Sequence, residues 1–187
     1  MRGFCFNLTL NPSPSRLRKA LRRSKGGEGL KHHLLNMKSV LFVCLGNICR
    51  SPMAEGILRN MAEQAGVKML IDSAGTGNWH AGEPPDERAT QTAGKRGVDI
   101  SKLRARQIKK DDFTKFDLIL VADAEVYRDV KRMAGTHSGK VEFIMNLAYP
   151  GSNKPVPDPY TGGMDGFEKV FDMLDEACEA VIRKYGK

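Results

Sequence analysis

Cys44 and Arg50 stand six positions apart, between a short apolar run and a helical pattern of apolar residues. A thiol placed just before a helix N-terminus and near a guanidinium is favoured as the thiolate, which is the nucleophilic form. The same helix amides and the forked guanidinium suit a tetrahedral oxyanion such as phosphate. We therefore interpret residues 39–56, which read SVLFVCLGNICRSPMAEG, as an oxyanion cradle with a nucleophile at its floor.

Three neighbouring residues fit this interpretation. Gly46 permits a tight backbone, Ser51 can hydrogen-bond a thiolate, and Pro52 suits the first helical turn, where a missing N–H costs nothing. The alternative is that Cys44 is a buried thiol at the end of a strand and Arg50 a surface charge, because their spacing alone is a weak pattern. The strand before them and the Ser-Pro and helix after them favour the cradle.

A phosphate ester also needs a proton for its leaving oxygen. Asp158 is the candidate donor, because Pro157 and Pro159 flank it and stiffen a loop that could hang over the cradle. Without the cradle, an aspartate in an ordinary turn would be the simpler interpretation. The prediction of an acid at this position therefore depends on the prediction of the cradle.

Two large aromatic residues, Trp79 and Tyr160, lie in segments rich in Gly and Pro. They could form the walls of a slot for an aromatic leaving group, although a lone tryptophan more often serves packing. His80 and His137 have no motif neighbour, and we expect both to be structural or solvated.

Apolar patterning predicts strands and helices in alternation along the body of the chain. The strands are expected at residues 39–43, 69–73, 117–122 and 140–145. The helices are expected at residues 51–66, 86–96, 123–133 and, with a capping box of Asp165 and Glu168, over the C-terminal segment. This order predicts an α/β fold: a single three-layer domain with a four-stranded parallel sheet and helices on both faces. Ligands of such sheets bind beyond the carboxyl ends of the strands, where Cys44 lies.

The charge of the chain is concentrated at its N-terminus. Residues 1–37 contain eight Lys or Arg and one acid, whereas residues 38–187 contain 22 basic and 21 acidic residues, so most of the net charge of +8 belongs to the first segment. The body therefore does not indicate binding to nucleic acid. No window approaches the roughly 18 apolar residues that a membrane span requires.

The composition of residues 1–37 predicts a disordered basic extension ahead of a domain at residues 38–187. It resembles an organellar transit peptide, which would place the protein in a plastid or mitochondrion. The alternative is a dispensable upstream start with Met37 as the functional first residue, and a chain that begins at Met37 or Lys38 is then expected to fold and be active. The four cysteines, Cys5, Cys44, Cys49 and Cys178, form no metal-type spacing, and a disulfide framework is not expected at this length. A cytoplasmic, reducing location is the simplest expectation.

Taken together, these residues carry a family resemblance. The segment 43–52, VCLGNICRSP, resembles the signature loop of the low-molecular-weight protein tyrosine phosphatases. Further matches follow in the family's order at residues 72–76 (DSAGT), 79–80 (WH), 85–88 (PDER), 104–107 (RARQ) and 158–160 (DPY). The resemblance covers residues 38–187 and none of 1–37.

The resemblance implies a role for each residue of the cradle. It implies that Cys44 attacks phosphorus to form a cysteinyl-phosphate, that Arg50 binds the phosphoryl oxygens, and that Asp158 protonates the leaving phenol and then activates water. It implies that Ser51 helps the thiolate to leave. The phosphate-binding loop would comprise Leu45, Gly46, Asn47, Ile48, Cys49 and Ser51.

Further implications concern support, substrate and redox chemistry. Asn47 would hold the strained loop through hydrogen bonds that include Ser73. The substrate slot would be lined by Leu45, Ile48, Trp79 and Tyr160. Cys49 could form a reversible disulfide with Cys44 and so protect it from over-oxidation. No metal or cofactor is implied. The expected partner is a tyrosine-phosphorylated protein or a small aryl phosphate, with no nucleic acid or membrane, and the expected state is a monomer.

Two departures from the family and three rival functions remain open. Leu103 stands where many members have a histidine in the Asn/Ser network, which predicts a looser loop, and Thr161 replaces the second tyrosine of the animal members.

Protein-arginine phosphatases have a small polar residue at the position of Ile48, so this branched apolar residue favours an aromatic ester. An arsenate reductase of the same fold needs more downstream cysteines than Cys178. A phosphotyrosine-binding module would need a broken site.

Overall fold

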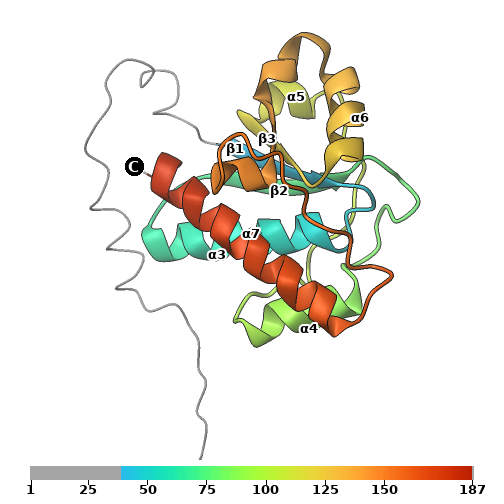
Figure 1. The fold of residues 1–187 in the computed structure, drawn as a ribbon, viewed down its shortest axis with the longest axis vertical. Coiled ribbons are helices and arrows are strands. Elements are labelled where there is room, and N and C mark those ends of the chain that lie inside the picture. The colour runs from blue at the N-terminus through green and yellow to red at the C-terminus, as the bar shows by residue number, and fades with distance from the viewer. Residues whose placement is uncertain (1–38, 187) are drawn as a thin grey trace, which may run out of the picture.

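The computed structural model describes residues 39–186, which form one parallel sheet covered by helices (Figure 1). The strands are β1 (Ser39–Cys44), β2 (Leu70–Gly75), β3 (Leu118–Val121) and β4 (Val141–Phe143), and their order in the sheet is β2-β1-β3-β4. All three neighbouring pairs are parallel, as the alternation of strands and helices predicts. Residues 1–37 lie outside the described residues, so the expectations for that segment stay predictions.

The strand β1 occupies the middle of the sheet, and all six of its residues are buried. Its side chains alternate between two apolar layers, because successive residues of a strand point to opposite faces. Val40 and Phe42 join one core cluster, whereas Leu41 and Val43 join the other. The registers place Cys44 opposite Gly75 on β2, so the nucleophile candidate ends a strand that is fixed on both sides.

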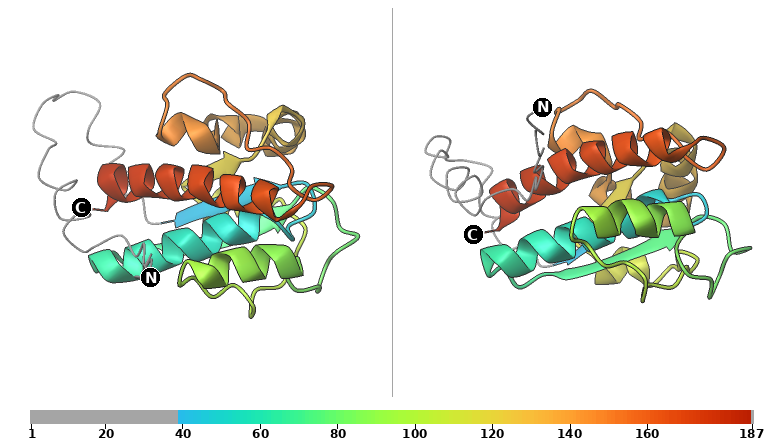
Figure 2. Two further views of the ribbon diagram at one scale, coloured as in Figure 1. Left: turned by 60° about the horizontal axis from the view of Figure 1, so that its bottom comes forward. Right: turned by 90° about the horizontal axis from the view of Figure 1, so that it is seen from below.

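Helices cover the two faces of the sheet and complete the three layers. One layer contains α3 (Arg50–Ala65), α4 (Glu87–Lys95) and α7 (Met164–Tyr185), and the other contains α5 (Asp112–Lys115) and α6 (Ala124–Ala134). Figure 2 shows α3, α4 and α7 together on one side, with α6 on the opposite side. Apolar residues at helical spacing explain this placement: Phe167, Phe171 and Leu174 of α7 are all buried.

The helix ends follow the expected chemistry in two places and differ in a third. Asp86 and Asp123 are the N-cap residues of α4 and α6, and each side chain accepts hydrogen bonds from backbone amides of the first turn. The capping box predicted for α7 is wrong, because the N-cap is Gly163, which has no side chain that could accept a hydrogen bond. Asp165 lies inside the first turn instead, where its charge still complements the helix dipole.

The last strand is shorter than its apolar run predicts. The chain leaves β4 at Phe143 and turns into the 3-10 helix η2 (Ile144–Leu147), and another 3-10 helix, η1 (Gly135–Lys140), precedes the strand. Lys140 donates to the carbonyl oxygens of Phe113 and Phe116, so it belongs to the packing at the sheet edge rather than to the ladder.

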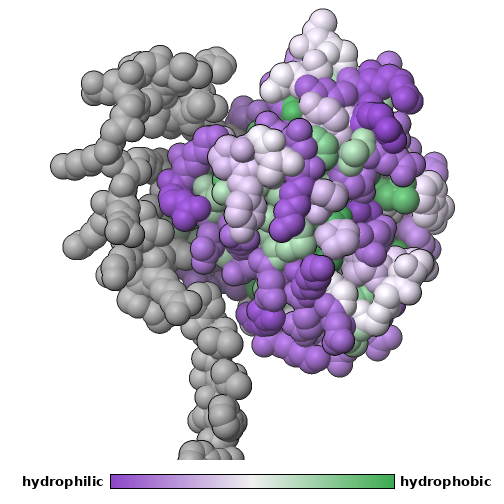
Figure 3. Space-filling view, in the orientation of Figure 1, coloured by the Kyte–Doolittle hydropathy of each residue, from purple (hydrophilic) through white to green (hydrophobic). Residues whose placement is uncertain are grey.

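The surface of the described residues is mainly polar. The visible face in Figure 3 is mostly hydrophilic with small hydrophobic patches. The large apolar or aromatic side chains that are exposed are Leu70, Trp79, Met133, Tyr149 and Tyr160. Among residues 39–186, no helix is both long and apolar enough to cross a membrane.

Candidate active site

The cradle is the loop that joins the end of β1 to the start of α3. Cys49 is the N-cap of this helix and Arg50 its first residue. The loop is deeply buried: 2% of Cys44 and 3% of Arg50 are exposed. The helix therefore points its N-terminal amides at the same buried region as the thiol, which is the arrangement that stabilises an anion.

Two donors face the sulfur of Cys44. The backbone N–H of Asn47 donates to Cys44 Sγ over 3.3 Å, and the hydroxyl of Ser51 lies 3.0 Å from the same sulfur. Because both groups can donate to a thiolate, they favour the charged, nucleophilic form. The contact with Ser51 that the sequence suggests is present in the structure.

Asn47 braces the loop from the inside. Its φ of +57° lies in the left-handed region, which is unfavourable for a residue with a side chain. Its amide nitrogen donates to the hydroxyls of Ser51 and Ser73 at 2.9 Å each, and its amide oxygen accepts from the backbone N–H of Arg106 at 2.9 Å. These three bonds hold the left-handed backbone in place. Leu103, the residue expected to leave the loop looser, is half-buried against the core. Asn47 is held instead by the backbone amide of Arg106.

A buried carboxyl group supports this bracing network. Glu55, which is 3% exposed, accepts from Ser73 Oγ over 2.6 Å and from Arg59 Nε over 2.8 Å. Burial raises the pKa of Glu55, and the bonds from Ser73 and Arg59 oppose that shift. The hydrogen bonds thus run from the surface cation Arg59 to the cradle without interruption.

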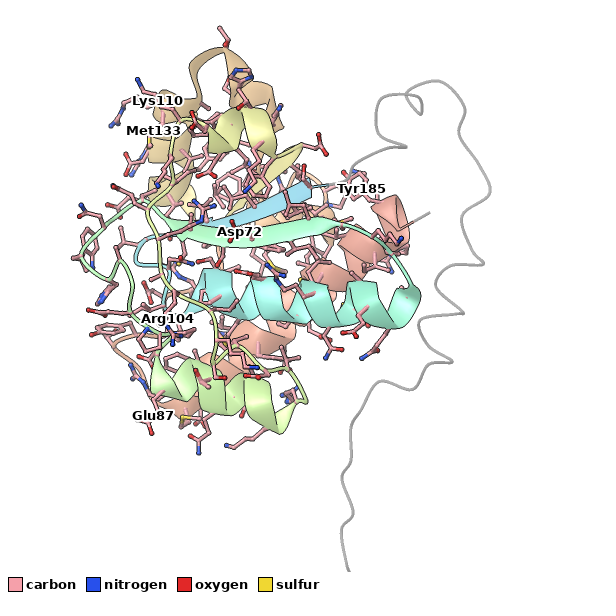
Figure 4. All side chains as sticks on the ribbon, turned by 180° about the vertical axis from the view of Figure 1, so that it is seen from behind. Asp72, Glu87, Arg104, Lys110, Met133 and Tyr185 are labelled. Carbon is pink, nitrogen blue, oxygen red and sulfur yellow. The ribbon has the colours of Figure 1, made fainter. Side chains whose placement is uncertain are left out.

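Arg106 is itself anchored on both sides. Its guanidinium pairs with Asp72 on β2, labelled in Figure 4, over 2.9 Å and with Asp112 of α5 over 2.9 Å. Because the backbone N–H of Arg106 donates to Asn47, these two ion pairs fix the segment that closes the cradle from behind. The sequence match at residues 104–107 gives no indication of this role.

Arg50 is forked between two carboxylates. Its Nη2 lies 2.7 Å from Asp158 Oδ2, and its Nη1 lies 2.7 Å from Asp123 Oδ2. Its buried Nε has no hydrogen-bond partner among the described residues, so one donor of the guanidinium is left for a bound anion. Asp123 is not among the site residues predicted from the sequence, although it directly follows the third predicted strand and so belongs at the carboxyl edge of the sheet.

These side chains surround a single pocket of about 120 Å³. Its lining residues are Cys44, Leu45, Gly46, Ile48, Cys49, Arg50, Trp79, His80, Asp158 and Tyr160. Trp79 is 61% and Tyr160 50% exposed, so both stand at the rim, whereas Cys44 is at the base. The structure therefore brings together all of the residues expected to be catalytic or to line the slot.

His80 stands beside Trp79 among the residues that line the pocket. It lines the pocket, and its Nδ1 lies 2.6 Å from a carboxylate oxygen of Glu83. A Cβ on Gly46 would lie 3.2 Å from the His80 ring, so the ring packs closely on the cradle. Its contacts with Glu83 and Gly46 are compatible with the structural role expected for His80, and the structure adds that this residue belongs to the pocket lining.

Cys49 lies beside the pocket with properties unlike those of Cys44. Burial and the carboxylate of Asp86 raise the pKa of the Cys49 thiol strongly. Cys44, Cys49 and Cys178 are free thiols in this structure. Within residues 39–186, no group of three or more His, Cys, Asp or Glu side chains is arranged to hold a metal ion.

The family model of the low molecular weight phosphotyrosine protein phosphatases matches residues 39–187. The chain belongs to this family. It is 47% identical over 148 residues to a low molecular weight phosphotyrosine protein phosphatase of Schizosaccharomyces pombe, covering 77% of this chain and 94% of the relative. It is 39% identical over 154 residues to a low molecular weight protein-tyrosine-phosphatase of Bacillus subtilis, covering 81% and 97%.

A solved structure agrees with the sequence comparisons. A protein tyrosine phosphatase from Entamoeba histolytica matches with a TM-score of 0.73 and 34% identity, over 78% of this chain and 94% of that one. Family membership makes this chain a phosphatase of phosphomonoesters and confirms the resemblance in the signature loop. The predicted α/β fold with a four-stranded parallel sheet is confirmed as well.

Proposed function

We propose that this chain hydrolyses phosphotyrosine and aryl phosphates in two steps, with Cys44 as the nucleophile. In the first step the Cys44 thiolate attacks phosphorus, so that an S–P bond forms and the ester P–O bond breaks. The carboxyl group of Asp158 gives its proton to the leaving phenolate oxygen. In the second step a water oxygen attacks phosphorus, its proton goes to the Asp158 carboxylate, and the S–P bond breaks to release phosphate and the thiolate.

The arrangement of Arg50 is the observation that carries this proposal. Its Nη2 contacts the candidate acid, its unpartnered Nε is buried, and its helix begins at the loop that contains Cys44. A phosphoryl dianion bound by this guanidinium lies between the nucleophile and the acid. Charge that develops on the phosphoryl oxygens in the transition state then meets donors that are already in place.

The walls of the pocket support an aromatic ester as the substrate. The sulfur lies at the base and the aromatic rings of Trp79 and Tyr160 stand at the rim. A flat phenyl ring between the two would bring its phosphate to the cradle. The apolar side chain of Ile48 lines the same pocket, which disfavours the charged guanidinium of a phosphoarginine.

The supporting roles that we propose follow from the same contacts. Ser51 and the amide of Asn47 stabilise the departing thiolate, and the bonds of Asn47 to Ser73 and Arg106 keep the loop preorganised. We further propose that residues 38–187 act as a monomer in the cytoplasm on tyrosine-phosphorylated proteins or small aryl phosphates. The near balance of charge in this segment supports partners other than nucleic acid.

The test is the variant Cys44→Ser with p-nitrophenyl phosphate and a phosphotyrosine peptide. Turnover of both is expected to disappear, because a serine hydroxyl is a far weaker nucleophile than a thiolate. Orthophosphate or vanadate should still bind, since Arg50 and the loop amides are unchanged. Turnover that persists in this variant would contradict the proposal. A phosphoarginine peptide assayed in parallel discriminates the alternative substrate, which we expect to be hydrolysed poorly.

A further inference from the structure

Asp86 and Arg88 form a bridge between the cradle and the loop that contains Asp158. The backbone N–H of Asp86 donates to the carbonyl oxygen of Ile48 over 2.8 Å, so the start of α4 is bound to the cradle. Both carboxylate oxygens of Asp86 accept from Arg88, at 3.0 Å from Nε and 2.8 Å from Nη2. This paired contact fixes the plane of the guanidinium, and it holds the pKa of Asp86 below its usual range.

The same guanidinium contacts the acid loop, which we define as residues 148–163 between η2 and α7 and which contains Asp158. Arg88 Nη2 donates to the carbonyl oxygen of Tyr160 over 3.0 Å, and Nη1 donates to that of Gly162 over 3.0 Å. The guanidinium carbon also lies 4.6 Å from the centre of the Phe167 ring in α7. Figure 4 labels Glu87, the residue between Asp86 and Arg88, at the beginning of α4.

The bonds to Tyr160 extend to the candidate acid itself. The backbone N–H of Tyr160 donates to Asp158 Oδ1 over 3.1 Å, so the residue whose carbonyl is held by Arg88 also orients the carboxyl group. A continuous path thus leads from Ile48 in the cradle through Asp86 and Arg88 to Asp158. The ion pair of Asp86 and Arg88 therefore holds both loops.

Arg50 also contacts Asp158, but that contact has a different dependence on substrate. A phosphoryl group in the cradle competes for the donors of Arg50, because its oxygens need the same guanidinium. The contact of Arg50 with Asp158 therefore weakens when the acid is needed. Arg88 binds backbone carbonyls outside the cradle, so its bonds persist when substrate is bound.

We propose that Arg88 is a positioning residue that sets the distance and angle between Asp158 and the leaving oxygen of the ester. This inference rests on the proposed function, because it assigns a support to the acid of that reaction. An acid works only within hydrogen-bond reach of the proton acceptor, and a displacement of about 1 Å can cost on the order of 100-fold in rate. Loss of Arg88 should therefore impair proton donation while leaving nucleophilic attack intact.

The experiment compares leaving groups in the variant Arg88→Met, whose side chain keeps the apolar packing on Phe167 but cannot donate. For phenyl phosphate, which needs a proton on its leaving oxygen, kcat/KM, which reports the steps up to the departure of the leaving group, is expected to fall on the order of 10–100-fold. For 2,4-dinitrophenyl phosphate, whose leaving group needs no proton, it should fall about 3-fold at most. Arg88→Lys should recover only part of the loss, since a lysine provides charge without the fork.

Arg96→Met is the matched control. Arg96 follows the same helix, pairs with Glu168 and Asp172, and lies over the ring of Phe171 at 5.2 Å. Within residues 39–186, these ion-pair and ring partners of Arg96 all belong to α7 and not to the acid loop. This variant should lose similar ion pairs and show unchanged ratios between leaving groups. A ratio that shifts equally in both arginine variants would overturn the proposal.

A double variant separates positioning from general damage. With Asp158→Ala already present, Arg88→Met should add no further loss for phenyl phosphate, because the group that it positions is gone. Equal losses for good and poor leaving groups in Arg88→Met, or full additivity with Asp158→Ala, would overturn the proposal. If Arg88→Met does not fold, as judged by thermal unfolding, Asp86→Asn weakens the same fork and must show the same selective loss. The proposed function fails separately, through turnover in Cys44→Ser or inactivity of the unmodified chain.

Discussion

The two loops that contain the candidate nucleophile and the candidate acid are held in different ways. The cradle lies at the centre of the sheet, and 2% of Cys44 is exposed, whereas 46% of the Asp158 side chain is exposed. Asn47, Ser51 and Ser73 connect the cradle internally through buried hydrogen bonds. The acid loop is connected to the rest mainly through the guanidinium groups of Arg50 and Arg88.

This difference matches the work proposed for each loop. An oxyanion site is effective when its donors are fixed before the charge develops, because then no reorganisation is needed in the transition state. The loop of the proton donor must instead let the substrate enter, and its acid must release a proton and later accept one. A more exposed loop with fewer hydrogen bonds to the rest of the protein suits this role. Damage to the cradle should therefore reduce both stability and chemistry, and damage to the acid loop should reduce chemistry alone.

Among the variants that compare the two loops, Asp158→Ala is expected to have the largest effect. The rate for phenyl phosphate should fall by about 10²–10⁴-fold, because the leaving oxygen then departs without a proton. The rate for 2,4-dinitrophenyl phosphate should fall far less, and the thermal midpoint should stay nearly unchanged because the side chain is half-exposed. The measurement is kcat/KM for a series of aryl phosphates together with a melting curve.

The control for that variant is Asp165→Ala, which removes another exposed acid from the first turn of α7. Its rates should match those of the unmodified chain for every leaving group. Equal losses for good and poor leaving groups in Asp158→Ala would reject Asp158 as the acid. A large fall in its melting temperature would remove the distinction between the two loops.

Ser73→Ala tests the same comparison through the cradle instead of the acid loop. Ser73 is 4% exposed, donates to Glu55 over 2.6 Å and accepts from Asn47 over 2.9 Å. Its loss leaves buried polar groups short of a partner, which should lower the free energy of unfolding by about 1–3 kcal/mol. Because the cradle then loosens, the rates for good and poor leaving groups should fall together. Denaturant titration and the same aryl series measure both quantities.

Ser101→Ala provides the comparison, because it removes an exposed hydrogen bond to Asp99. Its unfolding free energy should change by at most about 0.5 kcal/mol. If Ser73→Ala were as mild as Ser101→Ala, the buried network would contribute little to stability. A leaving-group-dependent loss in Ser73→Ala would show that the two loops are not independent.

The smallest expected effect lies outside both loops. Burial and the neighbouring charge of Glu179 raise the pKa of Asp175 in α7 to about 6 from an ordinary value of 3.8. The folded chain therefore disfavours the ionised carboxylate, and this carboxyl group lowers stability as the pH rises from about 4 through 6. Asp175→Asn should raise the free energy of unfolding at pH 7–8 by about 1 kcal/mol, a value reduced for partial solvent exposure.

The gain from Asp175→Asn should shrink as the pH falls below 6 and vanish well below pH 4, where the Asp175 carboxyl group is protonated in the folded and the unfolded chain alike. Unfolding in denaturant at pH 4, 6 and 8 measures this dependence. The ratio of rates between leaving groups should equal that of the unmodified chain, because the residue touches neither loop. A stability gain that is the same at all three pH values would contradict the assigned pKa.

Local chemistry explains why the cradle was predictable from the sequence. The apolar run of β1, the glycine at position 46 that permits a tight backbone, and the Ser-Pro pair in the first turn of α3 are adjacent in the chain, so each indicates a local structure without any distant contact. The position of Asp158 at the pocket was predictable as well, because two flanking prolines indicate a stiff loop there. Family resemblance then supplied the connection between these distant segments.

The side chains that the sequence analysis missed depend on long-range contacts. Asp123 meets Arg50 across 73 positions of the chain, and Arg106 meets Asn47 across 59. No local pattern indicates such pairs, and only the order of strands in the sheet brings them together. The prediction of a capping box at Asp165 is wrong for the opposite reason. The local sequence pattern fits a capping box, but the N-cap of the helix is Gly163, two residues earlier.

Trp79 is the only tryptophan of the chain, and it stands at the rim of the pocket. The intrinsic indole fluorescence of this protein therefore originates at the entrance to the candidate active site. Emission wavelength and quenching report the polarity there without any attached label. The molecule thus contains a built-in optical reporter at the place where its ligands enter.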